Sequence, residues 1–142
     1  MPNPILPSWE YIPDGEPRVF GDRVYLYGSH DRPNCDDFCD FKLKVWSAPL
    51  SNLNEWTCHG HSFHTRPDRD HEADTPWTSS NLYAPDVIEK DGKYYLYAYI
   101  FSSKGAVGVA DRPEGPFKLL GQYNYAEEDA GDEGIYNDAG VL

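Results

Sequence analysis

The chain has 142 residues, carries a formal net charge of −12, and is 15% aromatic. This length fits one ordinary domain with room for a core. The acidic charge argues against nucleic acid and anionic membrane surfaces as partners, because both repel such a chain. No stretch approaches the roughly 20 apolar residues of a membrane helix. An acidic chain with many aromatic side chains suits neutral, hydroxyl-rich ligands such as sugars.

The N-terminal segment and the cysteines favour a cytoplasmic protein. Residues 1–11 lack the basic region and the apolar region of a signal peptide. The cysteines are odd in number, which fits a reducing compartment better than a disulfide framework: Cys35, Cys39 and Cys58.

The first predicted element is a β-hairpin within Pro13–Asp31. Two short runs rich in valine, phenylalanine and tyrosine, Arg18–Phe20 and Arg23–Tyr27, flank a Gly-Asp turn, which is the pattern of a hairpin. Asp14 stands at the mouth of the first strand in a Pro-Asp-Gly tripeptide, and such tripeptides commonly form turns. The residues alone leave open whether Asp14 is a turn former or a catalyst.

Further short strands are expected, separated by turns and one long loop. Residues 41–47 alternate apolar and polar side chains, as a half-buried strand does. A shorter strand begins at Trp56. Residues 60–80 are polar and rich in histidine, without a period of 2 or 3.6, which predicts a long surface loop. A second hairpin and two more strands follow within residues 82–120.

The two hairpins belong to a repeat with a spacing of about 70 residues. Phe20–Tyr27 aligns with Lys90–Tyr97, and Pro13-Asp14 precedes the first hairpin as Pro85-Asp86 precedes the second. Each unit holds about four short antiparallel strands, which is the content of one β-propeller blade. A sandwich built from hairpins is the rival architecture, but it does not predict units that each begin with an acid.

We therefore predict an all-β fold, a partial β-propeller of about two blades plus the start of a third. Blade 1 spans about residues 12–60, a loop about 60–80, blade 2 about 82–122, and the start of blade 3 about 135–142. Propellers use roughly four to eight blades. Two blades cannot close a ring, so we expect the chain to be the N-terminal piece of a larger protein.

Cysteines and histidines in the middle of the chain raise the question of a zinc site. Zinc sites often use a C-x(2–4)-C pair, which Cys35 and Cys39 match, and three histidines follow them: His59, His61 and His64. The histidine spacings are loose, however, and a second cysteine pair is missing. We therefore expect no metal site, and a polar loop with buried or free thiols.

Four segments resemble glycoside hydrolase family 43: Asn3–Leu6 (NPIL), Asp14–Asp31 (DGEPRVFGDRVYLYGSHD), Leu82–Tyr97 (LYAPDVIEKDGKYYLY) and Arg112–Phe117 (RPEGPF). They occur in the order and spacing of the family and cover nearly the whole chain. The resemblance implies a five-bladed propeller and an inverting glycosidase of carbohydrate metabolism that cleaves xylose- or arabinose-containing oligosaccharides. It implies no cofactor, apart from a calcium ion that the channel of the propeller would admit.

The resemblance also implies roles for two aspartates. The general base of the family maps onto Asp14, and the aspartate that tunes the pKa of the acid and orients the substrate maps onto Asp138. Both are commonly followed by proline in the family, whereas Gly15 and Ala139 follow them here. The general acid is a glutamate on a later blade and is expected beyond Leu142, so we expect this chain alone to be inactive.

Two further residues are candidate substrate contacts. Tyr83 precedes an Ala-Pro-Asp motif, where the family usually has an aromatic residue lining the sugar subsite. A tyrosine that fills the space between blades is an equal alternative. His30 follows the end of a predicted strand, where a hydrogen bond to substrate competes with a structural role. Asp86 is expected to cap a turn or to anchor its strand.

Two other functions stay open at this point. A non-catalytic carbohydrate-binding propeller module would bind oligosaccharides without turnover. A propeller glycoside phosphorylase also uses an early aspartate and would require phosphate.

Overall fold

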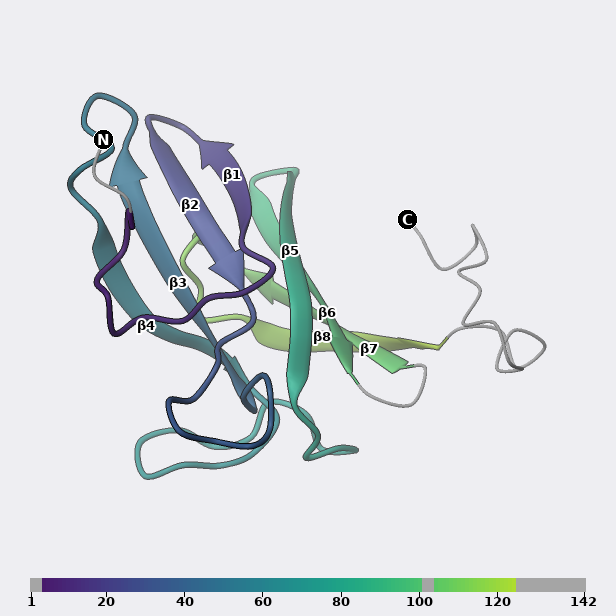
Figure 1. The fold of residues 1–142 in the computed structure, drawn as a ribbon. Helices are drawn as coiled ribbons and strands as arrows, with labels where there is room; N and C mark the ends of the chain where they lie inside the picture. The colour runs from purple at the N-terminus through teal and green to yellow at the C-terminus, as the bar shows by residue number, and fades with distance from the viewer. Residues whose placement is uncertain (1–3, 101–103, 125–142) are drawn as a thin grey trace, which may run out of the picture.

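The structure is a computed structural model that describes residues 4–100 and 104–124. This part of the chain forms two four-stranded antiparallel sheets (Figure 1), which confirms the all-β prediction. Within each sheet the strands lie in sequence order. The first sheet contains β1 (Glu16–Phe20), β2 (Arg23–Gly28), β3 (Lys42–Pro49) and β4 (Thr57–His64), and the second contains β5 (Leu82–Lys90), β6 (Lys93–Ile100), β7 (Lys104–Ala110) and β8 (Lys118–Asn124).

Both predicted hairpins form, each around a two-residue turn. Gly21-Asp22 joins β1 to β2, and Asp91-Gly92 joins β5 to β6. Gly21 has a φ of 61°, and Asp91 and Gly92 have φ values of 53° and 72°. Glycine adopts this left-handed backbone freely, and aspartate adopts it more readily than most residues. Two-residue turns with such backbones match the twist of the strands they join, so the turn sequence fixes the register of each hairpin.

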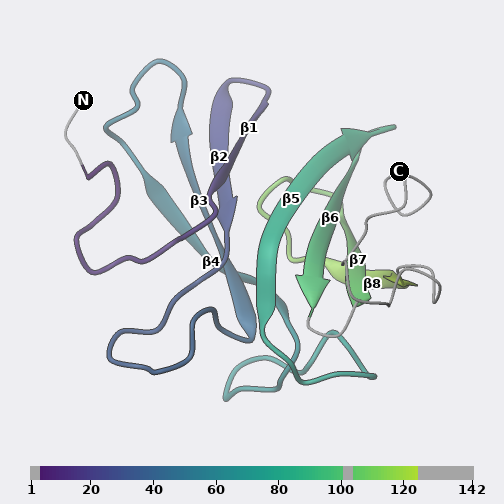
Figure 2. The ribbon, with the colours of Figure 1, turned by 45° about the vertical axis from the view of Figure 1, so that its right-hand side comes forward.

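The repeat is also confirmed, because β1–β4 and β5–β8 have the same order and connectivity. The first strands of the two sheets lie side by side, with β5 next to β1 and β2 (Figure 2). This is the arrangement of two consecutive propeller blades, in which the first strand of each blade is innermost. The predicted start of a third blade, at about 135–142, and Asp138 within it lie outside the described residues.

The predicted loop at 60–80 was wrong at its start, because β4 continues to His64. Its register against β3 shifts twice, so β4 carries extra residues at His59 and Ser62. Each such bulge moves the following side chains to the opposite face of the sheet. The alternation that would have identified the strand is therefore broken, and the loop occupies residues 65–81 instead.

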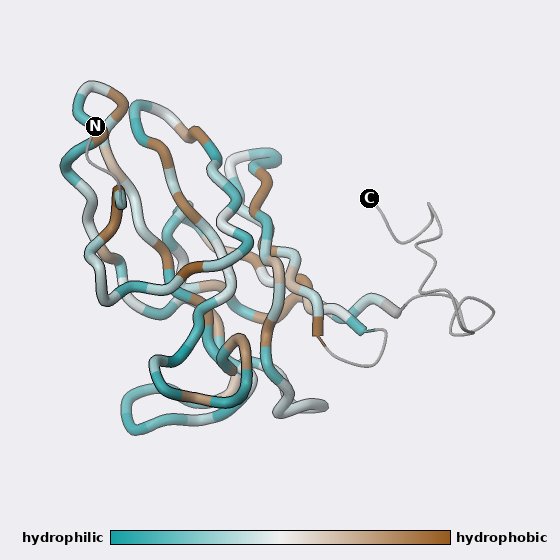
Figure 3. The backbone as a smooth tube through the Cα atoms, viewed as in Figure 1, coloured by the Kyte–Doolittle hydropathy of each residue, from teal (hydrophilic) through white to brown (hydrophobic). Residues whose placement is uncertain are grey.

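The two sheets share one hydrophobic core, which lies between them. Hydrophobic segments run along the strands, whereas the loop after β4 is hydrophilic along most of its length (Figure 3). Blade 1 contributes mainly large side chains to this core and blade 2 contributes smaller ones as well: Tyr25, Tyr27, Leu43, Val45 and Phe63 face Leu82, Val87, Leu96, Ala98, Ile100, Ala106, Ala110 and Phe117. Burial of this surface holds the blades together.

Two hydrogen bonds also connect the blades. The Tyr27 hydroxyl donates to the carbonyl of Pro113 at 2.7 Å, and the Phe117 N–H donates to the carbonyl of Ser62 at 3.0 Å. In the described part of the chain, no helix has the length and apolar character needed to cross a membrane.

Candidate active site

A hollow of about 530 Å³ lies where β1 and β5 begin. Its lining comes from two segments that the repeat aligns with each other, and it consists of Asp14, Gly15, Glu16, Arg18, Ala84, Pro85 and Asp86. The two Pro-Asp segments, 72 residues apart in the chain (86 − 14), therefore meet at one place between the blades. Three of the seven lining residues are carboxylates, so the hollow suits polar or protonated groups.

Arg18 lines this hollow and joins the two blades. Its guanidinium donates two hydrogen bonds to Asp86, from Nε to Oδ1 at 2.8 Å and from a terminal nitrogen to Oδ2 at 2.5 Å. The same terminal nitrogen lies 3.2 Å from a carboxylate oxygen of Glu16. Bidentate guanidinium–carboxylate pairs are both strong and directional. Asp86 thus anchors its strand to the neighbouring blade, within the range of roles expected from the sequence.

Asp14 occupies a turn that points it into the hollow. Its φ is 53°, and the turn directly precedes β1. The segment before it packs against the end of β2 at Gly28, where a Cβ would lie 2.3 Å from the side chain of Ile12 and 2.9 Å from the carbonyl of Pro13. The absence of a side chain at Gly28 therefore allows this turn to form. Asp14 is a turn residue and also a lining residue of the site.

Asp14 differs from the other two carboxylates of the hollow in having no partner. Glu16 and Asp86 both pair with Arg18, whereas the side chain of Asp14 makes no hydrogen bond or ion pair with any of the residues that the structure describes. Asp14 is also exposed. An exposed carboxylate without a hydrogen-bond donor is able to accept a proton from a water molecule in the hollow.

A buried ionic network holds the segment that leads to Asp14, and sequence reasoning missed it. The side chain of Glu10 is 1% exposed. It accepts hydrogen bonds from Lys44 Nζ at 2.9 and 3.1 Å and from Trp46 Nε1 at 2.9 Å. Both donors lie on β3, 34 and 36 residues from Glu10. No local pattern in the sequence indicates this pairing.

His30 belongs to the same network rather than to the lining of the hollow. Its Nε2 lies 3.2 Å from Glu10 and its Nδ1 lies 3.6 Å from Asp40, and its side chain is 13% exposed. These contacts give His30 a structural place between two buried carboxylates. Its predicted contact with substrate stays a prediction.

Tyr83 lies directly before the lining residue Ala84 and is half-buried. Its ring packs against Phe38, with the ring centroids 5.6 Å apart, and against Tyr99 at 5.9 Å. Phe38 is 71% exposed, which makes it an additional exposed aromatic residue beside Tyr83 that the sequence did not single out. Aromatic faces of this kind can stack on the apolar face of a sugar ring; for Tyr83 this role stays a prediction.

The cysteines and histidines do not gather as a thiol-based zinc site would require. Cys39 is buried, and Cys35 and Cys58 are exposed and free. In the described part of the chain, the side-chain groups able to hold a metal ion contain no cysteine. His59 instead contacts the Ser47 hydroxyl at 2.7 Å.

Two consecutive blades with a carboxylate-lined hollow on their innermost strands define the chain as part of a β-propeller protein with a site between its blades. The family model of glycosyl hydrolases family 43 matches residues 1–141. The chain therefore belongs to glycoside hydrolase family 43, as the resemblance of its motifs indicated.

Relatives of this chain include a xylosidase/arabinosidase of Thermoclostridium stercorarium, which is 46% identical over 128 residues, covering 88% of this chain and 26% of that protein. Xylosidase/arabinosidase 43A of Humicola insolens is 37% identical over 119 residues, covering 75% of this chain and 34% of that protein. The chain thus spans about a quarter to a third of the length of these two relatives.

Solved structures agree with the fold. A GH43_1 enzyme from Xanthomonas citri complexed with xylose superposes with a TM-score of 0.69 at 27% identity, over 86% of this chain and 35% of that one. CoXyl43, a β-xylosidase/α-arabinofuranosidase from a compost metagenome in complex with xylotriose, superposes with a TM-score of 0.59 at 34% identity, over 82% of this chain and 36% of that one. These matches confirm that the two sheets are blades of the family's five-bladed propeller.

Proposed function

We propose that the protein containing this chain is an inverting glycosidase that hydrolyses O-glycosidic bonds of xylose- or arabinose-containing oligosaccharides, with Asp14 as its general base. The observation that carries the proposal is the carboxylate of Asp14, which has no hydrogen-bond or ion-pair partner among the described residues and lies in a hollow whose other two carboxylates are held by Arg18. Membership of family 43 supports it, as do relatives named as xylosidase/arabinosidases. The xylose and xylotriose bound by neighbouring structures support the same substrate class.

In this reaction Asp14 takes a proton from a water molecule, and the water oxygen attacks the anomeric carbon from the face opposite the leaving group. A carboxylic acid protonates the leaving oxygen, and in inverting enzymes the two carboxyl groups stand roughly 6.5–9.5 Å apart. Asp138 would tune the pKa of that acid and orient the sugar. Tyr83 and His30 would contact the substrate.

The acid itself is a glutamate of a later blade in this proposal. The 142 residues alone should therefore release little or no product, because the leaving group has no proton donor. Robust turnover by this chain alone would refute that assignment.

The test is hydrolysis of nitrophenyl xyloside and nitrophenyl arabinofuranoside by the longest natural polypeptide that contains this chain. Asp14→Asn should lower kcat about 10²–10⁴-fold with a small change in KM, because it removes a proton acceptor used in the transition state. Asp22→Asn, which changes an exposed turn residue of the same hairpin, should leave both constants unchanged.

Three outcomes would overturn the proposal. Full turnover by Asp14→Asn would exclude Asp14 as the base. Oligosaccharide binding that survives Asp14→Ala, with no turnover by the parent protein, would identify a non-catalytic binding module. Turnover that requires phosphate would identify a phosphorylase.

A further inference from the structure

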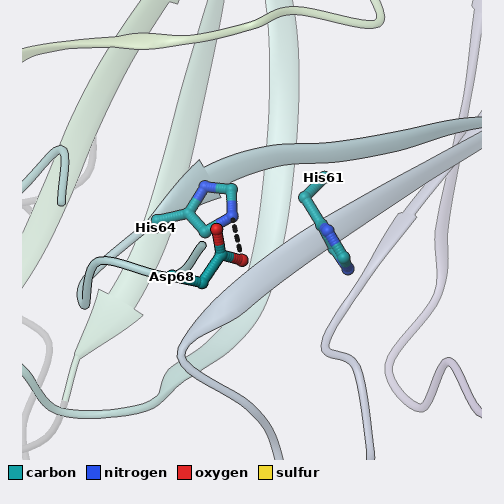
Figure 4. A group of neighbouring side chains, drawn as sticks. All are labelled: His61, His64 and Asp68. Carbon is teal, nitrogen blue, oxygen red and sulfur yellow. Dashed lines mark ion pairs between the residues drawn. The ribbon is translucent and has the colours of Figure 1, made fainter. Parts of the chain in front are cut away.

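A cluster of histidines and aspartates lies at the end of β4, apart from the hollow. His61 and His64 come from the strand, and Asp68, His71 and Asp74 come from the loop that follows. His61, His64 and Asp68 each offer one ligand atom, and these three atoms lie within 4.8 Å of one another (Figure 4). The motifs that support the glycosidase proposal do not use this cluster.

His64 is the unusual member of the cluster. The residue is 2% exposed, yet neither ring nitrogen has a hydrogen-bond partner in the described part of the chain. A buried imidazole without partners costs free energy, because water would otherwise bond both nitrogens. A group that binds the ring would remove this cost, which makes the site a candidate for a ligand that the protein recruits.

We propose that His61, His64 and Asp68 bind a divalent transition-metal cation, and that Zn²⁺ suits their two imidazole nitrogens and one carboxylate oxygen. A tetrahedral Zn²⁺ with bonds of roughly 2.0–2.2 Å holds its ligand atoms roughly 3.3–3.6 Å apart. His64 Nε2 and Asp68 Oδ2 are already 3.6 Å apart. His61 is exposed and closes the remaining gap by turning its side chain.

The ring orientations favour this set over the one that His64 could form with His71 and Asp74. A metal ion lies in the plane of each imidazole that binds it. The planes of His61 and His64 cross at 76°, so a cation can lie on the line where they meet. The rings of His64 and His71 are stacked at 17° with centroids 4.1 Å apart, and nearly parallel planes share no such position.

Asp74 completes the arrangement by holding His64 from the other side. One of its carboxylate oxygens accepts the backbone N–H of His64 at 2.8 Å and lies 3.9 Å from His64 Nδ1. A small approach would let Nδ1–H donate to this carboxylate and leave the Nε2 lone pair for the cation, the usual pairing of a metal-bound histidine.

The ammonium group of Lys42 would compete with the cation for the carboxylate of Asp68. Its Nζ lies 3.1 Å from the same Oδ2 of Asp68. The backbone N–H groups of Asp70 and His71 donate to the other oxygen of Asp68, Oδ1, each at 3.0 Å, so Oδ2 is the oxygen for which Lys42 and the cation compete. A Zn²⁺ ion would replace the ammonium at Oδ2 and link β4 to the loop 65–81 that leads into β5.

The test is a titration of the metal-free protein with Zn²⁺, followed by calorimetry, in a Cys35→Ser/Cys58→Ser background that removes the exposed thiols. Saturable binding of one Zn²⁺ is expected. Asp68→Asn and His61→Gln should each weaken Zn²⁺ binding more than 100-fold. Asp74→Asn should weaken it about 10–100-fold, which is the usual effect of removing a residue that hydrogen-bonds a metal ligand. Lys42→Gln should tighten binding, because it removes the competing ammonium.

Two controls keep the result specific. His59→Gln changes a histidine of the same strand that bonds Ser47 and should leave Zn²⁺ affinity unchanged. Co²⁺ bound in place of Zn²⁺ should show the visible bands of nitrogen and oxygen ligation without a thiolate charge-transfer band. The proposal would be overturned if the folded parent protein showed no saturable Zn²⁺ binding, or if Asp68→Asn and His61→Gln bound Zn²⁺ as tightly as the parent. Asp68 and His61 are half-buried and exposed, so their variants decide the question even if His64→Gln fails to fold.

Discussion

Replacing Glu10 with glutamine should destabilise the protein by about 3 kcal/mol. Removing one partner of a buried ion pair costs about 3–5 kcal/mol, because the other charge stays buried without compensation. The side chain of Glu10 is 1% exposed and that of Lys44 is 13% exposed, so the pair falls within this case. Glutamine keeps one acceptor oxygen, and Glu10 Oε2 already accepts from both Lys44 and Trp46, so one oxygen can keep both hydrogen bonds while the charge is lost. The expected cost is therefore at the lower end of the range.

Thermal unfolding followed by circular dichroism at pH 7 measures this effect. For a chain of this size about 1 kcal/mol corresponds to a shift of about 3–4 °C, so Glu10→Gln should lower Tm by about 10 °C. Glu89→Gln changes an exposed carboxylate on β5 and should shift stability by less than about 0.5 kcal/mol. Adding Lys44→Met to Glu10→Gln should recover part of the loss, because both charges are then gone.

The same variant has a defined pH dependence. Burial by itself raises the pKa of Glu10, but the hydrogen bonds from Lys44 and Trp46 and the nearby charges outweigh it and hold the pKa below its usual value. A carboxyl group with a lowered pKa contributes stability that is present above its unfolded pKa and is lost as pH falls through its folded pKa. The difference between the parent protein and Glu10→Gln should therefore shrink below about pH 4. A variant within about 0.5 kcal/mol of the parent at pH 7, or a difference that persists unchanged in acid, would refute the reasoning.

Two further substitutions test how the blades and the turn before Asp14 are held. Tyr27→Phe should cost about 1–3 kcal/mol, because it leaves the carbonyl of Pro113 without its donor in a part-buried contact between blades. Urea unfolding with an unchanged m-value would measure this cost, and a neutral substitution would mean that water replaces the bond. Gly28→Ala should cost about 1–3 kcal/mol, because the new Cβ would lie 2.3 Å from the side chain of Ile12 and 2.9 Å from the carbonyl of Pro13. Unchanged stability together with unchanged kcat in the longer polypeptide would show that the segment before Asp14 moves freely.

The strands were predictable where the signal is local. Turn residues such as Gly21 and Gly92 and the alternating side chains around them identify each hairpin within about ten residues. The repeat then assigned the two hairpins to equivalent places in successive blades. This inference needs no knowledge of which distant residues touch, so it succeeded.

The elements that sequence reasoning missed depend on distant or irregular pairing. β4 was shortened because bulges at His59 and Ser62 hide its alternation. The partnership of Glu10 with Lys44 depends on a contact between the N-terminal segment and β3, and in the sequence Glu10 is an ordinary acid in a proline-rich stretch. Such contacts follow from the tertiary fold and leave no periodic signal.

The repeat alone makes Asp14 and Asp86 equivalent, since each follows a proline and precedes a hairpin. The structure separates them by register, because Asp86 pairs with Tyr97 as Glu16 pairs with Tyr27. Arg18 pairs with Tyr25, and the residue at the matching place in blade 2, opposite Tyr95, is Ile88. Arg18 binds Asp86 with both donors and lies close to Glu16. Two of the three carboxylates of the hollow are thereby compensated, while Asp14 has no such partner in residues 4–100 and 104–124. A single arginine on β1 thus both ties the blades together and distinguishes the proposed base from the other two carboxylates of the hollow.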